Sequence, residues 1–130
     1  MKRYLITLFV ALSAVVGFVC VAADSGAGIQ FTSTKHDFGN IKASGGRVTA
    51  TYKFTNTGSK PLVIISVTNG GCGCTTPSYP KEPIAPGKSG EITIKFDPTG
   101  RRGEFNREVK VKTNASKKRE SLRFSGVIIP

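Results

Sequence analysis

The sequence predicts an all-β protein, an antiparallel β-sandwich of about seven short strands preceded by a signal peptide. Several runs alternate apolar and polar residues with the period of two that a half-buried strand requires. The 15 Gly and 7 Pro separate these runs as turn residues. No helical periodicity extends beyond about two turns after the first segment. With 130 residues, of which 38% are hydrophobic, the chain has the material for one domain with its own core.

The first segment has the layout of a secretory signal peptide. Lys2 and Arg3 precede an uncharged, largely apolar stretch over residues 4–23, which ends in small residues at Ala23. We therefore assign residues 1–23 to the signal peptide. Two alternatives are an uncleaved anchor, since the stretch is about 20 residues long, and a lipid on Cys20. All three predict an exported protein that is periplasmic, on the cell surface or secreted. Membrane contact is expected only through the anchor or the lipid.

The first strands follow a glycine-rich joint. Residues 24–28 are expected to be a flexible segment, and the sandwich domain is expected to span residues 29–130, with an opening strand near residues 29–33. Residues 47–55 alternate cleanly, which predicts a half-buried strand. Its inward face should carry Val48, Ala50, Tyr52 and Phe54. Residues 62–67 are nearly all apolar and β-branched, so we expect them to form a central strand.

The later strands repeat this pattern. A short edge piece is expected around Thr75, and alternating runs predict strands over residues 91–97, 105–113 and 121–129. The side chains expected to face inward are Ile92, Ile94, Phe96, Val109, Val111, Leu122, Phe124 and Ile128. Since the chain beyond the signal peptide has only two Cys close together, hydrophobic packing must hold the domain together.

The order of short motifs along the chain resembles a known family. These motifs lie at residues 36–41 (His-Asp-Phe-Gly-Asn-Ile), 54–58, 62–64, 72–77 (Cys-Gly-Cys-Thr-Thr-Pro), 84–87, 90–92 and 96–98. Together they resemble the bacterial family catalogued as domain of unknown function 1573. The resemblance implies an immunoglobulin-like sandwich, related in architecture to the major sperm protein and Hydin-type modules. It also implies export to the cell envelope, and it brings no established reaction.

Cys72-Gly73-Cys74 is the most unusual motif for chemistry. Residues two apart in an extended segment point the same way, so the two thiolates could chelate copper or zinc, with His36 as a third ligand. A disulfide between them is an alternative, and its small ring would be easily reduced. A third reading is thiol–disulfide exchange, for which Lys81 is the nearest cation along the chain. The pair could also be two small buried side chains.

His36-Asp37-Phe38-Gly39 is interpreted as a corner between a strand and a turn, with Phe38 packed inward. Adjacent residues of an extended strand point to opposite sides, so Asp37 is poorly placed to orient His36. The chain has one His, eight acidic residues and no Ser in a nucleophile-elbow motif. We therefore expect no enzymatic activity and no obligatory cofactor.

Prolines recur at every third position over residues 77–86. In a polyproline II helix such prolines share one face, and with Tyr79 they would form a ridge that a partner binds. The alternative, which we favour, is a stiff loop that protects a sheet edge. The candidate partner-binding residues of this segment are Pro77, Tyr79, Pro80 and Pro83.

The formal charge is +11, and part of it is predicted to gather on the last hairpin. The basic residues concerned are Lys110, Lys112 and Arg123 on the outward face and Lys117, Lys118 and Arg119 at the tip of the loop. Such a face could attract anionic glycans or lipids. The alternative, which we favour, is a solvated face that keeps the protein soluble. A nucleic-acid partner is not expected, because no exposed aromatic residue interleaves the charges. We therefore expect an exported, non-enzymatic envelope module that binds proteins or glycans, with soft-metal binding or thiol redox chemistry at the Cys pair as the alternative.

Overall fold

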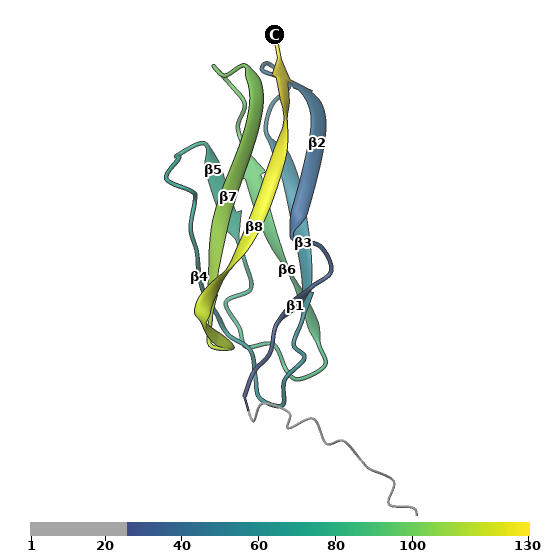
Figure 1. The fold of residues 1–130 in the computed structure, drawn as a ribbon, viewed down its shortest axis with the longest axis vertical. Coiled ribbons are helices and arrows are strands. Elements are labelled where there is room, and N and C mark those ends of the chain that lie inside the picture. The colour runs from purple at the N-terminus through teal and green to yellow at the C-terminus, as the bar shows by residue number, and fades with distance from the viewer. Residues whose placement is uncertain (1–25) are drawn as a thin grey trace, which may run out of the picture.

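The computed structural model describes residues 26–130, and this part of the chain is all β (Figure 1). The predicted signal peptide and Cys20 lie outside the described residues. The strands are β1 (Gln30–Phe31), β2 (Lys35–Lys42), β3 (Val48–Thr55), β4 (Ile64–Val67), β5 (Thr75–Ser78), β6 (Ser89–Phe96), β7 (Gly103–Thr113) and β8 (Ser116–Ile129). They form two four-stranded sheets, in the orders β1-β3-β6-β5 and β2-β8-β7-β4. The all-β sandwich is confirmed.

The strand order is that of an immunoglobulin constant-type domain whose first strand is divided between the two sheets. β1 pairs antiparallel with β3, and β2 pairs parallel with β8 in the other sheet. The β2 strand corrects the sequence analysis in two respects. It is an eighth strand where a corner was expected, and its pairing makes the sandwich not wholly antiparallel. A bulge between Asp37 and Asn40, with Gly39 at φ 68°, shifts the alternation by one residue and so hides the strand in the sequence.

The predicted inward faces of the long strands are confirmed. Every residue expected to face inward is buried except Val48, which is partly buried. A cluster of four rings spans both sheets: Phe96 of β6 stacks on Phe105 of β7 with centroids 4.7 Å apart, and Phe38 and Phe124 lie 6.0 Å apart beside them. Full burial of an aromatic side chain of this size stabilises the fold by roughly 1.5–3 kcal/mol.

The prediction that residues 62–67 form a central strand is wrong, because β4 is the edge of its sheet. Its pairing with β7 shifts between Ile64 and Ser66, and this bulge lets both Ile64 and Val67 face the core. Ile65, between them, is 49% exposed. The apolar run therefore reflects a bulge rather than burial on both faces.

A fully buried amide directly after β3, that of Asn56, holds several loop segments together. The side chain of Asn56 accepts hydrogen bonds from the backbone N–H groups of Gly28 (3.2 Å) and Gly58 (2.9 Å). It donates to the carbonyls of Lys60 (2.8 Å) and Ile84 (2.9 Å). All of its capacity is thereby used. Since Gly28 belongs to the segment expected to be flexible, the contacts of the domain begin before residue 29.

Replacing this amide should therefore be costly. We expect Asn56→Ala to lower the free energy of unfolding by about 3 kcal/mol, because it leaves buried donors and acceptors without partners. Urea unfolding followed by circular dichroism measures the change. Asn40→Ala, at an exposed position of β2, is the matched control and should shift stability by less than about 0.5 kcal/mol. Equal effects of the two substitutions would contradict this role.

Tyr52 joins the two sheets by a hydrogen bond. Its side chain is 2% exposed, and its hydroxyl donates to the Arg123 carbonyl of β8 at 2.7 Å. Burial raises the pKa of Tyr52 to about 12 from its ordinary 10.0. The folded protein therefore favours the neutral phenol.

This burial predicts a loss of stability at alkaline pH. The contribution of the neutral phenol is fully present below about pH 10 and is lost as the pH rises through about 12, where the folded protein also ionises. Tyr52→Phe should reduce the alkaline loss in unfolding free energy by about 2–3 kcal/mol, while costing about 1 kcal/mol at neutral pH. Unfolding curves between pH 8 and pH 12 measure both effects. An unchanged alkaline loss in Tyr52→Phe would refute the assignment.

Candidate functional site

The outward face of the β2-β8-β7 layer gathers polar side chains in two rows. Residues that alternate with the buried ones point to solvent, so strand pairing fixes which of them are neighbours. Arg123 of β8 lies opposite Lys35 of β2 and Glu108 of β7. In the adjacent row, Ser125 lies between Asp37 and Asn106.

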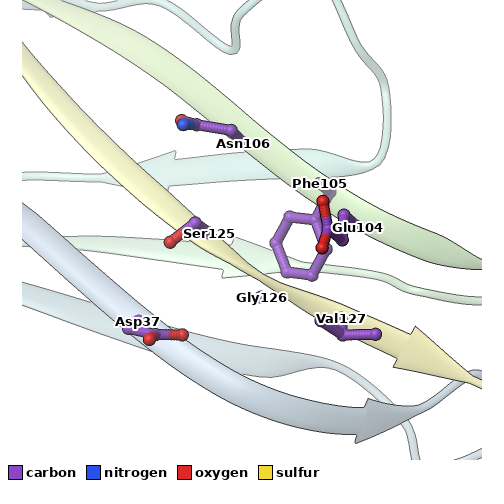
Figure 2. Close-up of a pocket in the computed structure, with 7 residues that line it drawn as sticks. All are labelled: Asp37, Glu104, Phe105, Asn106, Ser125, Gly126 and Val127. Carbon is purple, nitrogen blue, oxygen red and sulfur yellow. The ribbon is translucent and has the colours of Figure 1, made fainter.

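This face is hollowed along β8. A shallow hollow of about 480 Å³ has Phe105, Gly126 and Val127 in its lining (Figure 2). A second hollow of about 520 Å³ reaches Lys35 and Arg123. Asp37, Asn106 and Ser125 line both hollows, which therefore adjoin as one groove.

Gly126 and Phe105 shape the floor of this groove. A Cβ atom at Gly126 would lie 3.0 Å from the Phe105 ring and 2.8 Å from the Gly39 carbonyl, so β8 can carry only glycine here without a shift of its neighbours. With no side chain above it, the Phe105 ring is partly exposed and lines the groove. An apolar ring beside amide and hydroxyl groups is a combination suited to sugars.

The charges beside the groove are only partly neutralised. The Glu108 carboxylate forms an ion pair with the Arg123 guanidinium at 2.8 Å, and it lies 3.7 Å from the Lys110 ammonium group. The Arg123 side chain is 49% exposed, so this pair contributes less than about 1 kcal/mol. Glu108 faces two cations here, and Lys35 lies next to Arg123. Asp37 and Glu104 bring two further carboxylates to the groove, so cations and carboxylates alternate along this face.

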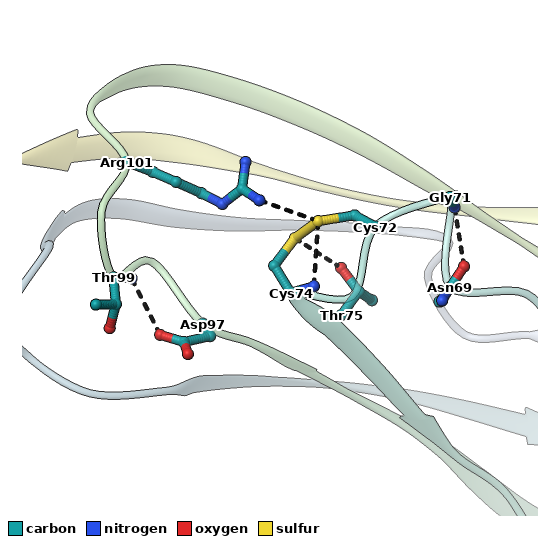
Figure 3. Close-up of a disulfide and its surroundings, with 8 residues drawn as sticks. All are labelled: Asn69, Gly71, Cys72, Cys74, Thr75, Asp97, Thr99 and Arg101. Atoms are coloured by element: carbon teal, nitrogen blue, oxygen red, sulfur yellow. Dashed lines mark hydrogen bonds between the residues drawn. A yellow bond between two sulfur atoms is a disulfide. The ribbon is translucent and has the colours of Figure 1, made fainter.

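The second unusual feature is the loop between β4 and β5, where Cys72 and Cys74 form a disulfide (Figure 3). Their Cα atoms are 5.2 Å apart, within the usual range for a bridge. The loop turns tightly because Gly70 and Gly71 have positive φ angles of 71° and 81°. Asn69 stabilises the turn by accepting the Gly71 N–H at 2.9 Å.

Two donors point at one sulfur of this disulfide. Arg101, from the turn between β6 and β7, places its Nη2 atom 3.2 Å from the Cys72 Sγ, and the Cys74 N–H donates to the same sulfur at 3.1 Å (Figure 3). Asp97 lies at the start of the same turn. Thr99, through its hydroxyl and then its backbone N–H, holds the pKa of Asp97 below its usual range, and the charges of Arg47 and Arg101 act in the same direction.

The proline segment lies along the outer edge of β4. Leu62 and Ile84 exchange two backbone hydrogen bonds of 2.8 Å, and the Tyr79 hydroxyl reaches the Ile65 carbonyl at 3.5 Å. The Lys81 ammonium group lies 3.6 Å from the centroid of the Tyr79 ring. Residues 79–84 therefore cover part of the edge that β4 would otherwise expose, while Pro77 lies within β5.

The family model described as "Protein of unknown function (DUF1573)" matches residues 29–128. The chain belongs to the DUF1573 family. No curated protein matches the sequence of this DUF1573 domain.

Solved structures share the fold of this DUF1573 domain. A protein of unknown function from Porphyromonas gingivalis W83 matches with a TM-score of 0.68 at 21% identity, over 85% of this chain and 51% of that protein. The VesB protease of Vibrio cholerae matches with 0.59 at 15% identity, over 78% of this chain and 31% of the protease. The E. coli chaperone DraB matches with 0.52 at 13% identity, over 81% and 56% of the two chains. The DUF1573 chain thus spans about half of the length of the P. gingivalis protein and about a third of the VesB protease. At these low identities the likeness shows a shared fold only.

The structure brings together some predicted site residues of the DUF1573 domain and separates others. Within residues 26–130, no three His, Cys, Asp or Glu side chains gather as a metal site. The His36 ring packs edge-on against the Phe38 ring, with centroids 4.5 Å apart. The metal site proposed for Cys72, Cys74 and His36 stays a prediction. Lys110, Lys112 and Arg123 are exposed as expected. Lys117, Lys118 and Arg119 do not tip a loop: they belong to β8, because the turn is only Asn114-Ala115.

Sequence reasoning missed three contributors to these sites. Arg101 reaches Cys72 across 29 positions of sequence, and Asn106 and Ser125 meet only through the β7–β8 register. No motif marks them, because fold topology alone makes these contacts.

The part of the chain from residue 26 onward contains no helix long and apolar enough to cross a bilayer.

The disulfide should matter little to stability. It closes a loop of three residues, so its removal should lower the free energy of unfolding by only about 1.5 kcal/mol. Urea unfolding with and without a phosphine reductant tests this, and Cys72→Ser/Cys74→Ser should resemble the reduced wild type. A loss of more than about 3 kcal/mol would instead make the bridge a structural requirement.

Proposed function

We propose that this DUF1573 protein is an exported module of the bacterial cell envelope whose groove along β8 binds an anionic glycan without catalysing a reaction on it. The charged start and the apolar stretch at residues 2–23 support export. The observation that carries the binding role is the groove along β8. It combines hydroxyl and amide groups, the carboxylates of Asp37 and Glu104, the cations Lys35 and Arg123, and a partly exposed ring. The two cations gather in the hollow that lies away from Glu104, and that end of the groove would hold the anionic groups.

The chemistry of the groove matches that of a charged sugar polymer. Ser125, Asn106 and Asp37 offer donors and acceptors for hydroxyl groups at fixed spacing, because strand pairing holds their backbones. Lys35 and Arg123 supply positive charge for carboxylate or sulfate groups. An open, shallow groove suits one stretch of an extended polymer rather than a small enclosed ligand.

The opposite sheet provides a comparison within the same molecule. The outward residues of β3 are Thr49, Thr51, Lys53 and Thr55. Lys53 lies directly opposite Glu91 of β6, and Lys95 lies opposite Thr49 and Thr76. This face is mostly hydroxyl-bearing, with less charge. Lys53 and Lys95 are exposed cations like Lys35 and Arg123, so they supply control positions at which the same charge can be removed.

Binding to polygalacturonate, a polymer of uronic acids, tests the proposal. We expect Lys35→Ala/Arg123→Ala to weaken binding about tenfold or more. The matched control Lys53→Ala/Lys95→Ala, which removes the same charge from the other sheet, should change binding less than about twofold. Isothermal titration at about 0.1 M salt measures both affinities.

A second variant separates the groove from its charge. Ser125→Tyr keeps every cation but fills the point where the two hollows adjoin, so it should also weaken binding about tenfold or more. Equal losses in the two double variants would show attraction by net charge alone. No binding by the wild type to any acidic polysaccharide would reject the glycan proposal. Recovery of the protein from the cytosol would reject its export.

A further inference from the structure

The Cys72–Cys74 disulfide closes so short a loop that we expect it to add only about 1.5 kcal/mol of stability, which directs attention to its chemistry. The backbone already fixes both ends of the loop: the Cys72 carbonyl accepts the Thr75 N–H at 3.2 Å, and the Cys74 carbonyl accepts the Asp97 N–H at 2.9 Å. A bridge across one intervening residue joins no distant strands. Disulfides of this kind, at a surface loop on a rigid scaffold, belong to the labile class.

The surroundings of Cys72 are suited to a thiolate. A disulfide sulfur is a weak acceptor, whereas a thiolate is a full negative charge that hydrogen-bond donors stabilise strongly. The Arg101 guanidinium and the Cys74 N–H both point at the Cys72 Sγ. Asp97, on the same turn as Arg101, feels the positive charges of both Arg101 and Arg47, the latter from the segment before β3. These donors favour the reduced state, so they make the disulfide more oxidising.

The two sulfurs differ in their surroundings. Cys74 packs against the hydrophobic core cluster, and its Sγ lies 3.7 Å from the Thr75 hydroxyl. Cys72 is not packed against that cluster, and Arg101 approaches it from the turn between β6 and β7 (Figure 3). Both cysteines are partly buried. The guanidinium charge therefore draws an incoming thiolate toward Cys72, and Cys74, packed against the core cluster, is the resolving partner.

We propose that this protein is a disulfide donor, which oxidises cysteine pairs of other exported proteins through Cys72. A thiolate of the partner attacks the Cys72 Sγ, the bond between the two sulfurs breaks, and Cys74 leaves as a thiolate that takes a proton from water. The second partner thiolate attacks the partner's own sulfur in the mixed disulfide. Cys72 then leaves as a thiolate that Arg101 and the Cys74 N–H stabilise. The partner loses two electrons and two protons and gains a disulfide, and Cys72 and Cys74 end as a dithiol.

This chemistry goes beyond the glycan groove and does not depend on it. The groove lies on the β2-β8-β7 face, whereas the disulfide lies in the loop between β4 and β5, with no residue shared between them. Loss of glycan binding in Lys35→Ala/Arg123→Ala should leave disulfide transfer unchanged, so the two proposals succeed or fail separately.

Equilibration in glutathione buffers tests the role of Arg101. The protein is purified as the cell processes it, and the oxidised fraction of the pair is read by alkylation and intact mass. Arg101→Gln should shift the equilibrium about tenfold toward the disulfide. The neighbouring Arg102→Gln, which removes the same charge, should shift it less than about twofold. The Cys72→Ser/Cys74→Ser variant shows how much of the measured oxidation comes from Cys20 rather than from the pair.

The alkylation rate of the reduced protein gives a second readout. Half-maximal reactivity should fall at a pH below the value of about 8.5 that is ordinary for cysteine, and Arg101→Gln should move it back toward that value. A reactivity profile that is ordinary in the wild type and identical in Arg101→Gln would overturn the proposed role of Arg101.

A reduced peptide with two cysteines tests the transfer itself. The wild type should oxidise the peptide at least about tenfold faster than Cys72→Ser/Cys74→Ser. Cys74→Ser should accumulate a mixed disulfide between Cys72 and the peptide, whereas Cys72→Ser should accumulate much less. Peptide oxidation at the rate of the double variant would reject the proposal and leave the bridge an inert link. A mixed disulfide on Cys74 alone would reverse the assigned order of attack.

Discussion

The packing of phenylalanine rings across the two sheets is the constraint on which both candidate sites depend. Phe96 of β6 stacks against Phe105 of β7, from the opposite sheet, with centroids 4.7 Å apart. Phe105 then lines the groove below Gly126. Directly after Phe96, the Asp97 N–H bonds the Cys74 carbonyl and so fixes the disulfide loop. A void under either ring would therefore displace site residues as well as destabilise the core.

The two sites use this scaffold in different ways. The groove is built on paired strands, whose backbone positions are fixed by ladder hydrogen bonds, so it suits recognition of a repeating polymer. The disulfide lies on a glycine-rich loop, where residues with positive φ bring two sulfurs and a distant guanidinium together. Each site places a cation beside an acceptor, Arg123 beside Glu108 and Arg101 beside Cys72. In the groove, Glu108 partly neutralises the charge of Arg123, whereas at the loop the Arg101 guanidinium points at the Cys72 Sγ.

The edges of the sandwich are protected by different means. β1 is only two residues long, and β5 carries Pro77 in its short span. Residues 79–84 cover part of β4, while β2 is bent by its bulge and begins and ends with lysines. Short edges, proline, bulges and lysine all hinder the addition of a further strand. Recognition through the face of a sheet is consistent with edges protected in this way.

The sequence by itself determined the all-β class, the long strands and their inward faces, because burial of one face imposes a period of two on the residues of the chain. It did not determine β2 or the edge position of β4, because a bulge in each strand shifts that period. It also pointed to the Cys pair and to the basic hairpin. Only the tertiary structure decided which side chains lie beside them: Arg101 at Cys72, and Asn106 and Ser125 in the groove. Contacts between strands distant in sequence follow from register and topology, which no local pattern of residues encodes.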